Sequence, residues 1–105
     1  MTPAEFRSIA LSMEKASESA HMGHPDFRVG GKVFATLGYP DESCGALMLT
    51  PAEQEKLLKA HPGAFKHAAG AWGRRGSTIV QLDAVNAATL RRAIASAWQA
   101  RAPKA

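Results

Sequence analysis

The tetrapeptide Thr-Pro-Ala-Glu occurs twice, at residues 2–5 and at residues 50–53, and it constrains the fold more than any other feature. Threonine there caps free backbone N–H groups, proline suits the first helical position, and glutamate three residues on reaches back to the cap. The two copies therefore predict two helices, over residues 3–15 and 51–60. The residues after the two copies do not match each other, which excludes an internal repeat.

Between these helices the hydrophobic period changes from that of a helix to that of a strand. Apolar residues occupy every second position over residues 27–29 and 32–37, which is typical of a strand with one buried face. Phe34 falls at the intervening positions, in the same set as Arg28 and Thr36. The dipeptide Gly30-Gly31 between these segments supplies the positive φ angles of a two-residue hairpin turn. Residues 45–49 are short and apolar, and they predict a third strand.

A second hairpin and a final helix are predicted after residue 60. Residues 68–72 and 77–82 flank the sequence Gly73-Arg74-Arg75-Gly76, which is typical of a turn between two strands. Residues 86–101 then place Leu90, Ile94 and Trp98 at helical spacing, which predicts an amphipathic helix with one buried face.

The predicted element order is α-β-β-β-α-β-β-α. Antiparallel hairpins with helices gathered on one side indicate an α+β fold, a two-layer sandwich with a five-stranded antiparallel sheet. Only 27 apolar side chains in the 105 residues are larger than alanine, which is enough for one thin core and not for two. We therefore expect a single domain over residues 1–101 and a flexible tail over residues 102–105.

The net charge of +4 is unevenly distributed along the chain. Residues 1–55 carry 4 basic and 8 acidic side chains, whereas residues 56–105 carry 9 basic side chains and one acidic side chain. No apolar run approaches the ~20 residues that span a bilayer, and no secretory signal is visible. The single cysteine, Cys44, has no internal disulfide partner, so we expect a cytoplasmic protein without a membrane partner.

The basic half supplies the candidate binding residues. In the predicted hairpin and the last helix these are Lys66, Trp72, Arg74, Arg75, Arg91 and Arg92. Arginines at a hairpin tip contact phosphates, and a nearby tryptophan stacks on a base or sugar. The hypothesis is nucleic-acid binding, with DNA as the expected partner, by charge neutralisation and with little sequence specificity. The alternative is that Arg74 and Arg75 form a solvated loop and that Trp72 belongs to the core.

The sequence gives little support for a phosphate-binding loop, a metal site or a catalytic site. Gly30-Gly31-Lys32 lacks the first glycine and the hydroxyl residue of a phosphate-binding loop. His21 and His24 supply at most half of a zinc site, and Cys44 lacks the basic or helix-start environment that activates a thiol. No nucleophile elbow or catalytic carboxylate pair is present. We therefore expect no metal, no cofactor and no enzymatic activity.

Residues 24–37, with the sequence His-Pro-Asp-Phe-Arg-Val-Gly-Gly-Lys-Val-Phe-Ala-Thr-Leu, resemble the signature of the MmcQ/YjbR family of small bacterial proteins. Segments near residues 7–11, 49–58, 70–82 and 98–104 also resemble that family. The resemblance implies a two-layer fold with a five-stranded antiparallel sheet, also seen in type III secretion chaperones. Family members are usually labelled DNA-binding because their fold resembles a "double-wing" motif. The family offers no established catalytic residues.

The resemblance also makes Arg28 and Lys32, polar residues of this signature, candidate contacts to a ligand or partner. We expect them to lie close together on one face of the hairpin. The alternative is an exposed pair bridged to Asp26 or Glu18. A competing function is a protein-interaction or adaptor domain, in which acidic and basic halves of two copies pair head to tail. We accordingly expect a monomer or a weak homodimer.

Overall fold

The computed structural model describes residues 1–21 and 23–103 of the chain. In chain order the elements are α1 (Pro3–Leu11), β1 (Ser17–His21), β2 (His24–Val29), β3 (Lys32–Leu37), β4 (Cys44–Met48), α2 (Pro51–Ala60), β5 (Phe65–His67), α3 (Gly70–Arg74), β6 (Ser77–Gln81), the 3-10 turn η1 (Leu82–Ala84) and α4 (Ala87–Arg101). The fold is α+β, as predicted, but the sheet has six strands and not five.

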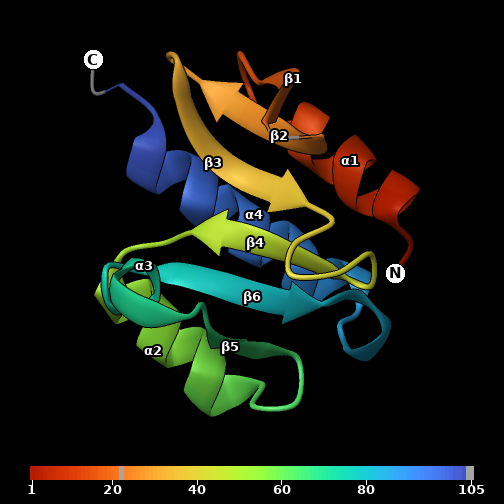
Figure 1. Cartoon of the computed structure of the whole chain (residues 1–105). Coiled ribbons are helices and arrows are strands. Elements are labelled where there is room, and N and C mark those ends of the chain that lie inside the picture. The colour runs from red at the N-terminus through yellow and green to blue at the C-terminus, as the bar shows by residue number, and fades with distance from the viewer. Residues whose placement is uncertain (22, 104–105) are drawn as a thin grey trace.

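The sheet is antiparallel throughout, with the strand order β1-β2-β3-β4-β6-β5. Helices α1 and α4 pack on one face of this sheet, and α4 passes behind β3 and β4 in Figure 1. Leu57 and Leu58 of α2 pack against the same core. In the part of the chain that the structure describes, no helix crosses the opposite face of β3 and β4, which we call the open face (Figure 1).

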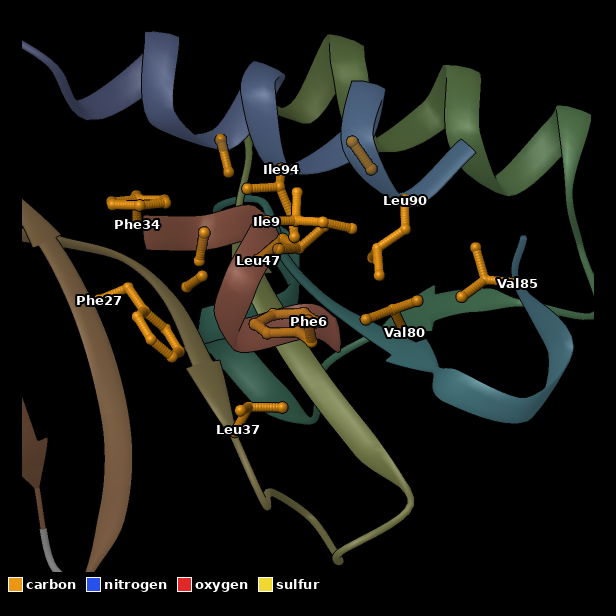
Figure 2. Close-up of a cluster of buried hydrophobic side chains, with 14 of the residues drawn as sticks. Phe6, Ile9, Phe27, Phe34, Leu37, Leu47, Val80, Val85, Leu90 and Ile94 are labelled. Carbon is orange, nitrogen blue, oxygen red and sulfur yellow. The ribbon is translucent and has the colours of Figure 1, made fainter. Parts of the chain in front are cut away.

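The core lies between the sheet and the two packed helices. Figure 2 shows Phe6 and Ile9 of α1, Leu47 of β4 and Ile94 of α4 pointing into one cluster. Leu90 and Phe34 belong to the same cluster, and both side chains are fully buried. This layer is the main core, and a smaller buried cluster of Cys44, Ala46 and Ile79 lies on the other face of the sheet.

Both threonine caps are present. The Thr2 side chain accepts a hydrogen bond from the backbone N–H of Glu5, and the Glu5 carboxylate accepts one from the backbone N–H of Thr2. The Thr50 side chain accepts from the backbone N–H of Glu53. The second helix ends at Ala60 as predicted, whereas α1 ends at Leu11 and not at residue 15.

Strand β1 supplies the sixth strand, and the sequence pattern did not predict it. It is short and polar, and it lies at the sheet edge beside β2, where Ser17 pairs with Arg28 and Ser19 with Asp26. Arg7 of α1 forms an ion pair with Glu18 of this strand. An edge strand with this composition shows no hydrophobic alternation, because the side chains of residues 17–20 are exposed on both faces.

A β-bulge overturns the predicted place of Phe34. Phe27 pairs with Ala35 but Arg28 pairs with Val33, so Phe34 is the extra residue between two pairs. Phe34 and Ala35 therefore both point into the core, and both are fully buried.

The predicted second hairpin is also wrong in its first strand. Residues 65–67 form the strand that pairs with β6, with Phe65 opposite Val80. Residues 70–74, part of the predicted strand and turn, form the short helix α3 instead.

The end of the chain contacts the fold as far as residue 103, although it is predicted as a flexible tail. Ala102 packs against the core, and the Pro103 ring lies so close to Gly30 that a Cβ there would meet its Cγ at 2.6 Å. Residues 104–105 lie outside the described residues.

Candidate functional site

The open face contains a groove of about 660 Å³. It crosses the sheet from β2 to α3, and its lining residues are His24, Val33, Thr36, Tyr39, Ala46, Met48, Ala68, Ala69, Trp72 and Ser77. The middle strand, β4, contributes only Ala46 and Met48, and the small alanine leaves the groove hollow. The uncovered face of the sheet is thus a concave and largely apolar surface.

Two aromatic side chains border this groove. Trp72 of α3 is 69% exposed and Tyr39 of the β3–β4 loop is 55% exposed, and they are the two large hydrophobic side chains that stand out as exposed among the described residues. The His24 ring meets the Tyr39 ring edge-on, with centroids 6.5 Å apart and planes at 76°. Trp72 is therefore not a core residue, which excludes the alternative interpretation of this side chain.

A buried amide anchors the helix that carries Trp72. Gln54 of α2 is 1% exposed, and its Nε2 donates to the carbonyl oxygens of Gly73 at 2.9 Å and Ser77 at 3.1 Å. Because a buried polar group without a partner is destabilising, these bonds hold both ends of the α3–β6 connection on α2.

Two glycines allow the same connection to pack closely. A Cβ at Gly73 would lie 1.9 Å from the carbonyl oxygen of Ala68, and a Cβ at Gly76 would lie 1.8 Å from that of Leu49. Gly76 also has a φ of +115°, a conformation that side chains disfavour. These glycines therefore serve close backbone approach, and they do not form the tip of a hairpin.

Asp26 and Arg28 form an ion pair on the open face beside the groove. Asp26 is 1% exposed, and its carboxylate accepts from Nε of Arg28 at 2.9 Å and from Nη2 at 3.1 Å. These hydrogen bonds to Asp26, followed by the charge of the carboxylate, raise the pKa of Arg28 above its ordinary value. The alternative of a bridge from Arg28 to Asp26 is thus confirmed. The pairing leaves Nη1 of the guanidinium without a protein partner in the described structure.

Lys32 does not join this pair. Its strand partner is Val29, whereas Arg28 is opposite Val33, so the pleat directs Lys32 and Arg28 to opposite sides of the hairpin. The prediction that the two cations share one face is wrong, because the two-residue turn pairs Lys32 with Val29 and not with Arg28.

The six basic and aromatic candidates divide into two groups. Lys66 of β5 lies opposite Ile79 on the open face, and Trp72, Arg74 and Arg75 belong to α3 and its C-cap at the same end of the sheet. Arg91 and Arg92 are exposed on α4, whose buried residues face the sheet from the other side. The α4 arginines therefore do not converge with the first group.

An acidic loop lies near Lys66 of the first group. Asp41 follows Tyr39 in the β3–β4 loop, and hydrogen bonds from the hydroxyl and backbone N–H of Ser43 lower the pKa of its carboxyl group. The positive charge of Lys66 makes a smaller contribution in the same direction. Asp41 is thus a fixed negative charge close to Lys66.

Other reactive side chains do not assemble into a site. Cys44 is buried, and its Sγ donates to Oε1 of Gln81 at 3.3 Å. His67 contacts Glu55 and the carbonyl oxygen of Gly73. Among the described residues no three His, Cys, Asp or Glu side chains gather as metal ligands, and no helix there has the length and hydrophobicity to cross a membrane.

A family model described as YjbR matches residues 11–100. The chain belongs to the YjbR family. No functionally curated protein matches it. A Deinococcus radiodurans protein, DR2400, which carries a DUF419 domain, has a similar crystal structure with a TM-score of 0.75. The two chains are 20% identical, and the match covers 92% of this chain and 75% of that one.

Within this YjbR domain, the 24–37 segment that resembles the family signature is the β2–β3 hairpin. Its apolar members Phe27 and Phe34 fill the core, and its polar members Asp26 and Arg28 form the ion pair on the open face. Sequence reasoning found Arg28 and Trp72, and named Asp26 as one alternative partner of Arg28, but it missed Tyr39 and the groove. Tyr39 stands in turn-like sequence, so only its unusual exposure distinguishes it.

Proposed function

We propose that this YjbR domain binds nucleic acid, without catalysis, through the α3 end of the open face. The carrying observation is that Lys66, Arg74 and Arg75 gather at that end beside the exposed ring of Trp72. No ion pair within the described residues neutralises these three cations.

The binding mechanism follows from this composition. Phosphates displace their counterions when they meet lysine and arginine side chains, which gives affinity with little sequence information. The exposed tryptophan adds a flat surface on which a base or sugar stacks. The proposal includes a cytoplasmic location, which a lone cysteine favours, and a monomer as the binding unit.

The test measures binding to a single-stranded and a duplex oligonucleotide at two salt concentrations. The double variant R74E/R75E is expected to abolish binding at low salt. R91E/R92E is the matched control, since it makes the same charge change on α4, across the sheet, and is expected to keep most of the affinity. If these three cations meet phosphates, log K falls with log salt at a slope of about −2.1 for single strands. Undetectable binding at low salt, or equal losses in both variants, contradicts the proposal.

A protein-interaction role is the second candidate, and the apolar lining of the groove favours it. The head-to-tail version requires the acidic N-terminal half of one copy to meet the basic half of another. It predicts a dimer at low salt that dissociates as salt is added, measured by sedimentation over a range of protein concentrations. A monomer under all these conditions contradicts self-association.

A further inference from the structure

The groove on the open face has the dimensions and lining of a ligand site. Its volume of about 660 Å³ falls within the range of ~300–1,000 Å³ that small-molecule sites occupy. Ala46, Ala68 and Ala69 keep it open, while Val33 and Met48 make it apolar. The exposed rings of Tyr39 and Trp72 belong to its lining. A flat, aromatic group fits this lining best, since rings stack on exposed aromatic faces.

Charge around the groove indicates what such a group is attached to. Arg28 lies on the β2 side, and Lys66, Arg74 and Arg75 lie at the β5–α3 end. Asp26 holds Arg28 through Nε and Nη2, which leaves Nη1 able to donate to an anion. A nucleotide within a polynucleotide chain matches this arrangement, because its base is the aromatic ring and its two flanking phosphates are the anionic groups.

Stacking on the aromatic rings of the groove favours single-stranded over duplex nucleic acid. In a duplex the base faces are covered by their neighbours, so neither aromatic ring of the groove reaches them. In a single strand the base faces are available for stacking on protein side chains.

We infer that the groove binds an unpaired base of a single-stranded nucleic acid, stacked on Trp72 and Tyr39. The flanking phosphates contact Arg28 on one side and the cations of the β5–α3 end on the other. This inference rests on the proposed function and names its ligand class. The polar lining consists of His24, Thr36 and Ser77, which offer hydrogen bonds to a base edge at only a few points. Preference among the four bases is therefore modest.

The experiment compares three probes of equal length: a single strand, the same strand with one central abasic site, and its duplex. The native chain is expected to bind the intact strand more tightly than the duplex at equal salt. W72A is expected to weaken single-strand binding about five- to a hundredfold, as the loss of one stacked base does. W72F restores most of that loss. Both substitutions are at an exposed position, so the fold is expected to persist.

A second readout follows the groove directly. In the W98F background Trp72 is the remaining tryptophan, and the single strand is expected to quench its fluorescence while the duplex does not. Two shorter strands of equal length, one intact and one with a central abasic site, are then compared. The abasic strand is expected to quench the Trp72 fluorescence less than the intact one.

Failure of this inference is distinguishable from failure of the proposed function. If R74E/R75E weakens all probes while W72A, Y39A and pairing into a duplex change nothing, the cationic end binds nucleic acid and the groove inference is overturned. If no probe binds at low salt, both are overturned. Self-association that W72A abolishes, without nucleic-acid binding, assigns the groove to a second copy of the chain and also overturns the inference.

Discussion

At the scale of single residues, Gln54 joins the core to the candidate site. Its buried amide donates to two backbone carbonyls, one in α3 and one at the start of β6. Replacing it with leucine leaves both carbonyls without this donor, so we expect Q54L to lower the free energy of unfolding by about 1–3 kcal/mol. Urea denaturation measures the change. Q99L, at an exposed position of α4, is the control, and an equal loss in both variants contradicts the anchoring role.

Phe34 shows where residue-level prediction from the sequence stops. Strict alternation places it in the same set as Arg28 and Thr36, but the bulge turns it into the core, where it is fully buried. Nothing in the local sequence marks the bulge, since it arises from the register between two strands. We expect F34A to lower the free energy of unfolding by about 3–5 kcal/mol, and K32A to leave it nearly unchanged. A small loss in F34A contradicts the bulged register.

At the scale of elements, the sequence identified the capped helices and the β2–β3 hairpin, because caps and glycine turns act locally. It missed β1, whose polar residues are ordered by pairing with β2, and it mistook α3 for part of a hairpin. A five-residue helix is too short to show a period, and no side chain caps it. The groove depends on this misassigned helix, so the sequence suggested Trp72 without the surface on which it acts.

The position of α3 depends on Gly73, and this gives a prediction for the element. A Cβ there would lie 1.9 Å from the Ala68 carbonyl oxygen, so G73A must displace α3 from the backbone at Ala68. We expect the variant to lose about 1–3 kcal/mol of stability and to bind single-stranded nucleic acid more weakly, because Trp72 moves with the helix. G63A is the control, since a Cβ at Gly63 meets no atom within 4 Å. Native behaviour in both variants contradicts this packing role.

At the scale of the whole molecule, the charge asymmetry of the sequence does not become one basic surface. The sheet separates the basic half into two groups, with Arg91 and Arg92 on the helical side and Lys66, Arg74 and Arg75 at the α3 end. Composition predicts how much positive charge the chain carries, but only the topology decides which side of the sheet each cation occupies. Four of the six residues predicted from the sequence therefore lie at the α3 end, and the other two, Arg91 and Arg92, lie on the opposite side of the sheet.

The acidic half also contributes to the potential of the open face. Asp41 is held in its charged form by Ser43 and lies close to Lys66, so it repels a polyanion from the cations there. The variant D41N removes that charge but keeps a side-chain oxygen that accepts the hydrogen bonds from Ser43. It is expected to raise the affinity for a single strand about two- to fivefold at low salt. E14Q makes the same charge change beside Trp98 on the helical side and is expected to raise it less. The difference between the variants should shrink as salt screens both charges. Equal effects at low salt, measured by titration of one labelled strand, would show that net charge and not its placement governs binding.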